Sequence, residues 1–183
     1  MKKKIILGVL ALLALVCLLS SVYTVEENQY ACTVRFSKII HTTQTPGLHF
    51  KVPFLDSVKY FPKAMMLYDI PPSEVLTSDK QNMTVDNYIL WRVSDPLLFY
   101  QSLGSTVVAE ERLNALTYNT LKTVMGTLSQ ADIINMDDAS ERNEIYAGIA
   151  SSVNALAQNY GIEVVDVKIK RFDLPEANEN AVY

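Results

Sequence analysis

The first 25 residues contain the longest apolar stretch of the chain. No charged residue occurs between Ile5 and Leu19, and the first acidic residue after this run is Glu26. At about 1.5 Å of rise per residue, the roughly 20 residues from Ile5 to Val25 would form a helix about 30 Å long, which matches the hydrocarbon thickness of a bilayer. The pattern therefore predicts a cytoplasmic tail and a transmembrane anchor within residues 1–25.

Three consecutive lysines occupy residues 2–4, directly before the apolar run. Because basic flanks stay on the cytoplasmic side, we expect a single-pass protein of the bacterial cell membrane with its remaining domain on the extracytoplasmic (periplasmic or outer) side. A cleaved signal peptide is the alternative, but Leu19 stands where cleavage favours a small residue. A lipid-modified Cys17 is disfavoured by the bulky Val16 before it. An uncleaved anchor is the favoured interpretation.

Two short segments after the anchor alternate between apolar and polar residues, which is typical of half-buried strands. In residues 29–36 the apolar face consists of Tyr30, Cys32, Val34 and Phe36. In residues 48–54 the apolar face consists of Leu48, Phe50, Val52 and Phe54. Proline cannot donate a ladder hydrogen bond, so Pro53 predicts that the second strand lies at an edge.

Two further strands are predicted between residue 64 and residue 93. The first is an apolar segment over residues 64–70 that ends at Pro71. The second has the longest alternation of the chain, over residues 81–93, with Asn87 as the one polar residue on its apolar face. This length of alternation predicts a central strand.

The second half of the chain changes to a helical period. Asp95 and Pro96 are typical of the first positions of a helix and predict a short helix through Tyr100. A longer helix is predicted over residues 106–128. Its apolar stripe consists of Leu113, Leu116, Thr120, Val124 and Leu128.

Another long helix is predicted to begin near Asp138, which forms a capping pair with Glu141. Its expected buried stripe consists of Ile145, Ile149, Val153, Leu156 and Tyr160. We expect Gly161 to end this helix in a left-handed conformation. A strand over residues 162–172 follows, in which Val165, Val167 and Ile169 alternate with charged residues.

The order of these elements predicts an α+β fold, with antiparallel strands first, then helices, then a returning strand. Residues 26–173 are interpreted as one domain, and residues 174–183 as the start of a C-terminal helix. Pro175 is accepted in a first helical turn, and the chain ends eight residues after it. We therefore expect the natural protein to continue past Tyr183.

The charge of the outer region limits its partners. Without the three lysines of residues 2–4, 13 of the 16 Lys and Arg remain against 20 Asp and Glu, a net charge of −7. This average charge disfavours nucleic acid and anionic lipid headgroups as electrostatic partners. Cys17 and Cys32 cannot form a disulfide framework in the outer region, and Cys32 is interpreted as a core residue.

The sequence contains no recognisable catalytic pattern. His41 and His49 lack the spacing of zinc ligands, and there is no phosphate-binding loop, dinucleotide glycine pattern or nucleophile elbow. We therefore expect no enzymatic activity, no catalytic residue, no cofactor and no metal.

Three stretches together resemble the SPFH (band 7) family, which contains stomatins, prohibitins, flotillins and bacterial HflK and HflC. They are PGLHFKVPF over residues 46–54, VDNYILWRVSDP over residues 85–96 and DVKIKRFDLP over residues 166–175. The second and third are similar to the corresponding parts of HflC-type members. The resemblance covers nearly the whole chain and implies an SPFH domain behind one membrane anchor.

The resemblance implies a non-enzymatic scaffold. HflC-type proteins assemble with HflK-like SPFH proteins into a hetero-oligomeric cage, which encloses the FtsH-like AAA protease of the membrane and modulates it. The signature residues Pro46, Gly47, Leu48, Phe50, Pro53 and Phe54 then become candidates for contact with the lipid bilayer. Core packing is the alternative role for each of them.

Two other functions stay open at this point. A stomatin-like, homo-oligomeric organiser of membrane microdomains would have the same fold. An anchored hydrolase of the cell envelope would require one indispensable serine, histidine or acidic residue, which the sequence does not single out.

Overall fold

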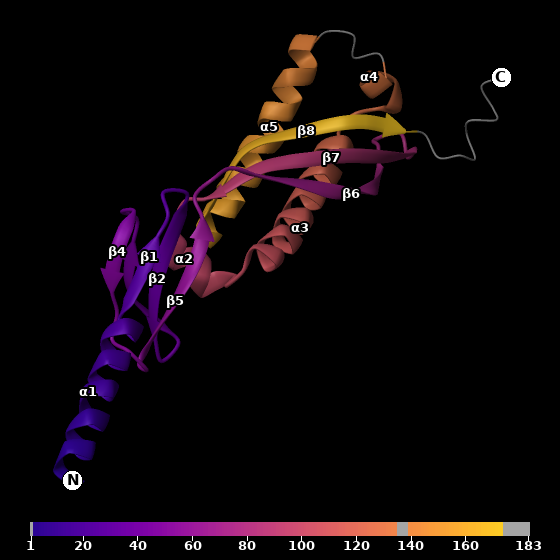
Figure 1. Cartoon of the computed structure of the whole chain (residues 1–183). Helices are drawn as coiled ribbons and strands as arrows, with labels where there is room; N and C mark the ends of the chain where they lie inside the picture. Colours follow the sequence, from indigo (N-terminus) through magenta and orange to yellow (C-terminus); the bar gives the residue numbers. More distant parts are fainter. Residues whose placement is uncertain (1, 135–138, 174–183) are drawn as a thin grey trace. The chain divides into compact units, whose positions relative to one another are not determined.

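The structure is a computed structural model that describes residues 2–134 and 139–173, with side chains described for residues 4–133 and 143–173 (Figure 1). It divides into two compact units, residues 1–64 and residues 65–183. The first unit contains two small sheets, the second unit contains one sheet, and each unit has its own buried residues. The predicted α+β order of strands, helices and a returning strand is confirmed across the two units.

The first unit begins with helix α1 (Lys2–Ser20). The predicted helix through Val25 is wrong at its C-terminal end, because Ser21 forms a turn and Val22–Val25 forms strand β1. Three of these four strand residues are β-branched, which favours an extended backbone over a helical one. No helix among the described residues reaches both the length and the apolarity of a membrane span.

The strands of the first unit form two small antiparallel sheets. Strand β1 pairs with β4 (Gly47–Phe50), and β2 (Gln29–Arg35) lies between β3 (Lys38–Thr43) and β5 (Asp56–Pro62). The predicted strand over residues 29–36 is therefore confirmed except at its last residue. Strands β1, β3 and β5 were not predicted.

Two details of the predicted strands in this unit are wrong. Phe36 does not share the buried face of β2, because it lies in the turn after this strand with φ of 48° and is 81% exposed. Strand β4 ends at Phe50, so Pro53 and Phe54 belong to the following turn rather than to an edge strand. Both turns contain positive φ values without glycine, which no composition signal revealed.

The core of the first unit forms where the two sheets meet. Tyr23 and Val25 of β1 pack against Ala31 of β2, so the two-stranded sheet covers one face of β2. The Tyr23 hydroxyl lies 3.1 Å from the Thr43 hydroxyl and 3.5 Å from the Thr33 hydroxyl. These polar groups are buried together, which satisfies them inside a small core.

The second unit contains a three-stranded antiparallel sheet in the order β6 (Met66–Leu76), β7 (Asn82–Val93), β8 (Ile162–Asp173). The prediction of a central strand is confirmed for β7. Strand β6 is longer than predicted, since it continues past Pro71 through a register shift between Ile70 and Ser73. A bulge on an edge strand accepts prolines that an inner strand would exclude.

Four helices and a short 3-10 turn follow β7 in the described part of the second unit. They are α2 (Pro96–Ser102), α3 (Thr106–Met125), α4 (Gln130–Ile134), α5 (Ala139–Ala157) and η1 (Gln158–Tyr160). The predicted cap of α2 is confirmed, because Asp95 Oδ1 accepts hydrogen bonds from Leu97 N at 2.9 Å and Leu98 N at 3.0 Å. The predicted cap at Asp138 and the helix after residue 174 lie outside the described residues.

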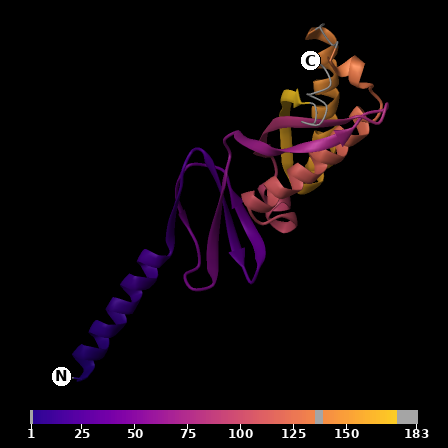
Figure 2. The same cartoon turned by 90° about the vertical axis from the view of Figure 1, so that its right-hand side faces the viewer.

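Helices α3 and α5 cover one face of the sheet (Figures 1 and 2). The covered face of β7 is at most 1% exposed and consists of Met83, Val85, Asn87, Ile89, Trp91 and Val93. The buried stripe of α3 passes through Thr117 and Leu121 rather than Leu116 and Val124. A shift of one position turns a side chain by about 100° around the helix axis. The helical period of the sequence therefore did not determine which residues of α3 form its buried stripe.

The end of α5 and the start of β8 combine one confirmed and two incorrect predictions. Gly161 has φ of 71°, as predicted for a left-handed helix end. The stripe of α5 ends on the buried Ala157, whereas Leu156 is 46% exposed. In β8 the register shifts beside Leu90, so Val165 bulges outward and is 43% exposed, contrary to the predicted uniform alternation.

Candidate membrane-contact surface

Helix α1 presents an uncovered apolar surface. Its large apolar side chains are all exposed, from 45% at Val16 to 71% at Leu7 and Leu19. Contiguous apolar surface of this kind indicates contact with a membrane or another protein. The residues that follow α1 show which part of the first unit continues this surface.

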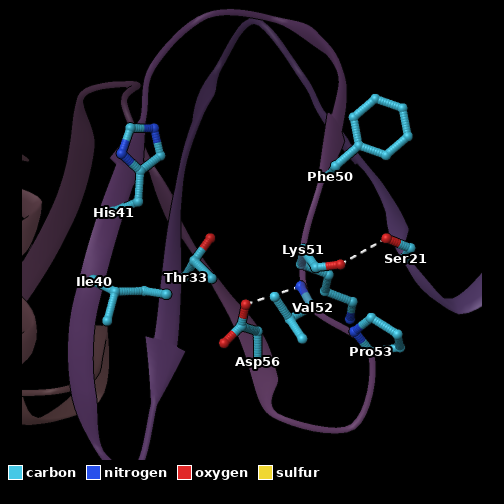
Figure 3. Close-up of a pocket in the computed structure, with 9 residues that line it drawn as sticks. All are labelled: Ser21, Thr33, Ile40, His41, Phe50, Lys51, Val52, Pro53 and Asp56. Atoms are coloured by element: carbon cyan, nitrogen blue, oxygen red, sulfur yellow. Dashed lines mark hydrogen bonds between the residues drawn. The ribbon is translucent and has the colours of Figure 1, made fainter.

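Ser21 fixes the C-terminal end of α1 to the end of β4. Lys51 N donates to the Ser21 carbonyl oxygen at 2.7 Å, and Ser21 Oγ donates to the Lys51 carbonyl oxygen at 2.7 Å (Figure 3). The next residue, Val22, lies opposite Phe50 in the β1–β4 ladder. The exposed Phe50 is therefore placed beside the end of the apolar helix.

The turn over residues 51–55 is held by the residue that follows it. Asp56 Oδ2 accepts a hydrogen bond from Val52 N at 2.9 Å, and Asp56 N donates to the Val52 carbonyl oxygen at 3.0 Å (Figure 3). The backbone of Phe54 has φ of 65°, and its side chain is 84% exposed. The turn therefore presents an aromatic side chain to its surroundings on a fixed backbone.

An ion pair connects this turn to the turn between β2 and β3. Arg35 Nε donates to Asp56 Oδ1 at 2.7 Å, and Arg35 Nη2 donates to Asp56 Oδ2 at 3.1 Å. The hydrogen bonds from Arg35 are the main reason that the pKa of Asp56 lies below its usual value of 3.8, and the Val52 N–H lowers this pKa further. The Asp56 side chain is only 3% exposed, so the pair is a fixed part of the fold.

Because Arg35 directly precedes Phe36, the ion pair brings Phe36 to the same end of the unit as the 51–55 turn. We call this region the apolar end. Its exposed side chains are Phe36 (81%), Phe50 (78%), Val52 (43%), Phe54 (84%) and Leu55 (50%). Large apolar residues are rarely this exposed together unless they meet a partner or a membrane.

The structure divides the six predicted contact residues between two places. Phe50, Pro53 and Phe54 lie at the apolar end, whereas Pro46 and Gly47 lie at the opposite end of β4, where Gly47 faces Val25. At about 3.3 Å per residue, Gly47 is roughly 10 Å along the strand from Phe50. Leu48 lies between them and is 69% exposed. Their contact with a bilayer stays a prediction.

Sequence reasoning missed Phe36 as a member of this surface. The alternation of residues 29–36 placed Phe36 on the inner face of a strand, and no glycine marked the turn that begins there. The polar pair Ser37-Lys38 was the only available signal of a strand end. Such a pair is too common to predict a turn by itself.

The two units differ in charge, which the average over the chain concealed. Residues 22–64 contain five Lys and Arg against three Asp and Glu, a net charge of +2. Residues 65–183 contain eight Lys and Arg against 17 Asp and Glu, a net charge of −9. The predicted repulsion of anionic headgroups therefore does not apply to the unit that carries the apolar end.

The described residues contain no arrangement that suggests catalysis. No three His, Cys, Asp or Glu side chains among them come close enough to hold a metal ion. His49 Nε2 lies 2.9 Å from the Thr45 carbonyl oxygen, and its ring lies 5.7 Å from the Tyr23 ring. His41 and His49 lie in strands of different sheets. The described residues thus give no candidate metal site in the first unit.

Residues 23–183 match the SPFH domain / Band 7 family, from the second residue of β1 onward. The chain belongs to this family. The match covers most of both units and includes the apolar end. The earlier resemblance of three short stretches is therefore confirmed at the level of the whole domain.

Relatives within the SPFH family are HflC proteins. The "Modulator of FtsH protease HflC" of Escherichia coli K12 is 28% identical over all of this chain and 67% of its own length. "Protein HflC" of Buchnera aphidicola subsp. Schizaphis graminum is 30% identical over 98% of this chain and 64% of its own length. "Protein HflC" of Haemophilus influenzae is 30% identical over 90% of this chain and 58% of its own length. The chain is an HflC-type SPFH protein. It spans about two thirds of the length of these relatives, or less.

Proposed function

We propose that this chain is a non-enzymatic, membrane-anchored scaffold subunit that modulates an FtsH-like AAA protease. The observation that carries the proposal is the similarity over the whole chain to the Escherichia coli protein named for modulation of FtsH. The uncovered apolar surface of α1 supports attachment to a membrane. The absence of a metal-binding cluster among the described residues is compatible with this role and does not carry it.

The apolar end supplies a reason why a short helix suffices for attachment. The uncharged run from Ile5 to Leu19 gives about 22 Å of helix, against about 30 Å of hydrocarbon in a typical bilayer. Phe50 and Phe54 lie beyond Ser21, next to the end of this run, and continue its apolar surface. In this proposal the residues of the apolar end enter the leaflet that α1 does not fully cross, and the bilayer adjusts to the remaining difference.

The proposed orientation follows from the three lysines at residues 2–4. Basic residues next to an apolar helix favour the cytoplasmic side, which leaves the SPFH domain on the extracytoplasmic side. Protease treatment of intact cells with a permeabilised outer layer tests this orientation. We expect the SPFH domain to be digested without lysis, whereas a domain that survives until lysis would overturn the orientation.

The proposed partners are an HflK-like SPFH protein and the protease itself, in a hetero-oligomeric cage. The β6–β7–β8 sheet leaves an edge of β6 and an edge of β8 without a neighbouring strand in the described part of the chain. Such edges are available for contacts between subunits. Purification of the full-length protein in mild detergent is expected to recover a second SPFH protein and an FtsH-like protease.

The same purification separates this proposal from its alternative. A homo-oligomer without a protease would favour a stomatin-like organiser of membrane microdomains. A clean monomer would contradict both assemblies. The substitution Leu12→Arg in α1 is a suitable companion, because a charge at the centre of a membrane helix costs about 3 kcal/mol and is expected to release the chain from the membrane.

Insertion of the apolar end can be measured by fluorescence. Trp91 is the single tryptophan of the chain and is fully buried, so it provides a constant background. Phe54→Trp in the membrane-bound protein is expected to show a blue-shifted emission that brominated lipids quench. Gln44→Trp, at the opposite end of β3, is the control and is expected to stay unquenched. Equal quenching of both, or of neither, would exclude insertion of the apolar end.

A further inference from the structure

A pocket of about 460 Å³ opens at the apolar end of the first unit (Figure 3). It is formed by Ser21, which follows α1, by residues of strands β2, β3, β4 and β5, and by the turn over residues 51–55. Its lining includes Ser21, Thr33, Ile40, Phe50, Lys51 and Asp56. Aromatic and aliphatic side chains alternate with polar ones around it, so the pocket suits an amphipathic molecule.

The polar part of the pocket is held in place by the fold. The Asp56 carboxylate faces Thr33 and Ile40 in Figure 3, and its charge is balanced by the bidentate pair with Arg35. Lys51 lines the same pocket; it forms no direct ion pair among the described residues, but its charge contributes to the lowered pKa of Asp56. Two cations, Arg35 and Lys51, therefore lie near one carboxylate, and this excess of positive charge favours an anionic ligand.

The location of the pocket narrows the ligand to a membrane lipid. Lys51 is the residue that Ser21 joins to the end of the apolar helix, and Phe50 next to it is 78% exposed. In a phospholipid the phosphate lies next to the start of the acyl chains. A cation beside exposed aromatic residues can therefore meet the phosphate while the aromatic residues meet the acyl chains. The net charge of +2 in residues 22–64 also attracts an anionic headgroup to this unit.

We propose that this pocket binds the phosphodiester headgroup of an anionic phospholipid, with Lys51 against the phosphate and Phe50 against the start of the acyl chains. The inference rests on the proposed membrane attachment and adds a specific lipid site to it. Its consequence is that the SPFH domain is held at the leaflet surface by a lipid and not only by α1.

Native mass spectrometry of the full chain, released from micelles with equal amounts of phosphatidylglycerol and phosphatidylcholine, tests the proposal. We expect the unaltered chain to retain one phosphatidylglycerol about fivefold in preference to phosphatidylcholine, the factor that one lysine contributes near a membrane surface. Lys51→Gln is expected to abolish the preference. Ile40→Trp, which fills the pocket without a change of charge, is expected to abolish it as well.

Lys59→Gln is the matched control, because it removes the same charge from an exposed position of β5 that does not line the pocket. It is expected to keep the preference. Equal loss in Lys59→Gln and Lys51→Gln would indicate diffuse charge attraction and overturn the site, as would a lack of preference in the unaltered chain. Displacement of the lipid by millimolar glycerol phosphate would also overturn it, since the ligand would then be a soluble phosphate.

Membrane attachment is measured separately by flotation of the same proteins with neutral vesicles. If the unaltered chain and all three variants float, the proposed anchoring holds whatever the result for the pocket. If none floats with neutral vesicles, the anchoring fails independently of the lipid preference.

Discussion

The two units of this protein use their large apolar residues in opposite ways. In the second unit Trp91 and Met83 of β7 and Phe99 of α2 are at most 1% exposed. In the first unit Phe36, Phe50 and Phe54 are 78% to 84% exposed. Burial of such side chains stabilises a fold by about 1.5 to 3 kcal/mol each, so the first unit leaves a comparable free energy available for its surroundings.

The difference has a structural cause. The first unit has only short strands in two small sheets, and its core of Tyr23, Val25, Ala31 and Val58 is built from strand residues in the described part of this unit. Specific polar contacts, such as the pair of Arg35 and Asp56, fix its turns instead. The comparison teaches that the second unit carries most of the apolar stabilisation, while the first unit presents a fixed surface.

The largest expected effect concerns the second unit at Gly161. A Cβ at this position would lie 2.4 Å from the Asp95 carbonyl oxygen and 2.7 Å from Phe99 N, on a backbone with positive φ. We expect Gly161→Ala to lower the free energy of unfolding by about 4 kcal/mol or more, because backbone must move. Calorimetry of the full chain measures this loss of stability.

Gly148→Ala in α5 is the control for this change, since a Cβ there meets nothing within 4 Å. It is expected to raise stability by about 0.5 to 1 kcal/mol through helix propensity. Similar losses in both variants would contradict the role of Gly161 as a close-contact site.

The same substitution in the two units gives the next largest contrast. Leu113 of α3 is fully buried, whereas Leu48 of β4 is 69% exposed. We expect Leu113→Ala to cost about 3 kcal/mol of stability through a cavity, and Leu48→Ala to change it by less than about 0.5 kcal/mol. Chemical denaturation measures both, and comparable losses would refute the proposed division between the units.

A smaller effect is expected at the polar residue inside the second core. The Asn87 side chain is fully buried, and neither of its polar atoms has a hydrogen-bond partner among the described residues. Asn87→Val is expected to raise stability by about 1 kcal/mol, because it removes unpaired polar atoms from an apolar environment. Thermal denaturation of the full chain measures the change.

Asn154 of α5 is the matched control, since its Oδ1 accepts a hydrogen bond from Val164 N at 2.9 Å. Asn154→Val is expected to lower stability by about 1 kcal/mol, because it leaves this N–H unpaired. A loss of stability in Asn87→Val as well would show that Asn87 has a stabilising role.

The smallest expected effect concerns the apolar end and depends on pH. The pKa of Asp56 is lower in the folded protein than its usual value of 3.8, chiefly because of the hydrogen bonds from Arg35. The ion pair therefore stabilises the first unit fully above about pH 4, and its contribution is lost as the pH falls through the lowered pKa.

Asp56→Asn is expected to remove this dependence, so that the two proteins differ above pH 4 and converge in stronger acid. Hydrogen exchange at residues 51–56 between about pH 3 and pH 7 measures the difference. Glu27→Gln, at an exposed position of the same unit, is the control and is expected to leave the profile unchanged. A constant difference at every pH would exclude the ion pair as its cause.

Elements with strong local signals were predicted correctly. The alternation of β7, the cap of α2 at Asp95 and the left-handed Gly161 each depend on residues close together in the sequence. Elements without such signals were missed, as for β1, which was assigned to the helix before it. Strand β1 has only four residues and directly follows the apolar helix, so it offers too few positions for a period of two to be detected.

The sequence by itself determined the family, the general succession of strands, helices and a returning strand, and the apolar character of α1, because these follow from local periodicity and short motifs. Only the tertiary structure decided which exposed residues act together. Ser21 meets Lys51 across 30 positions, and Arg35 meets Asp56 across 21. These contacts bring Phe36 to the same end as Phe54 and form the pocket, since pairing between distant segments depends on the fold as a whole and leaves no periodic trace in the chain.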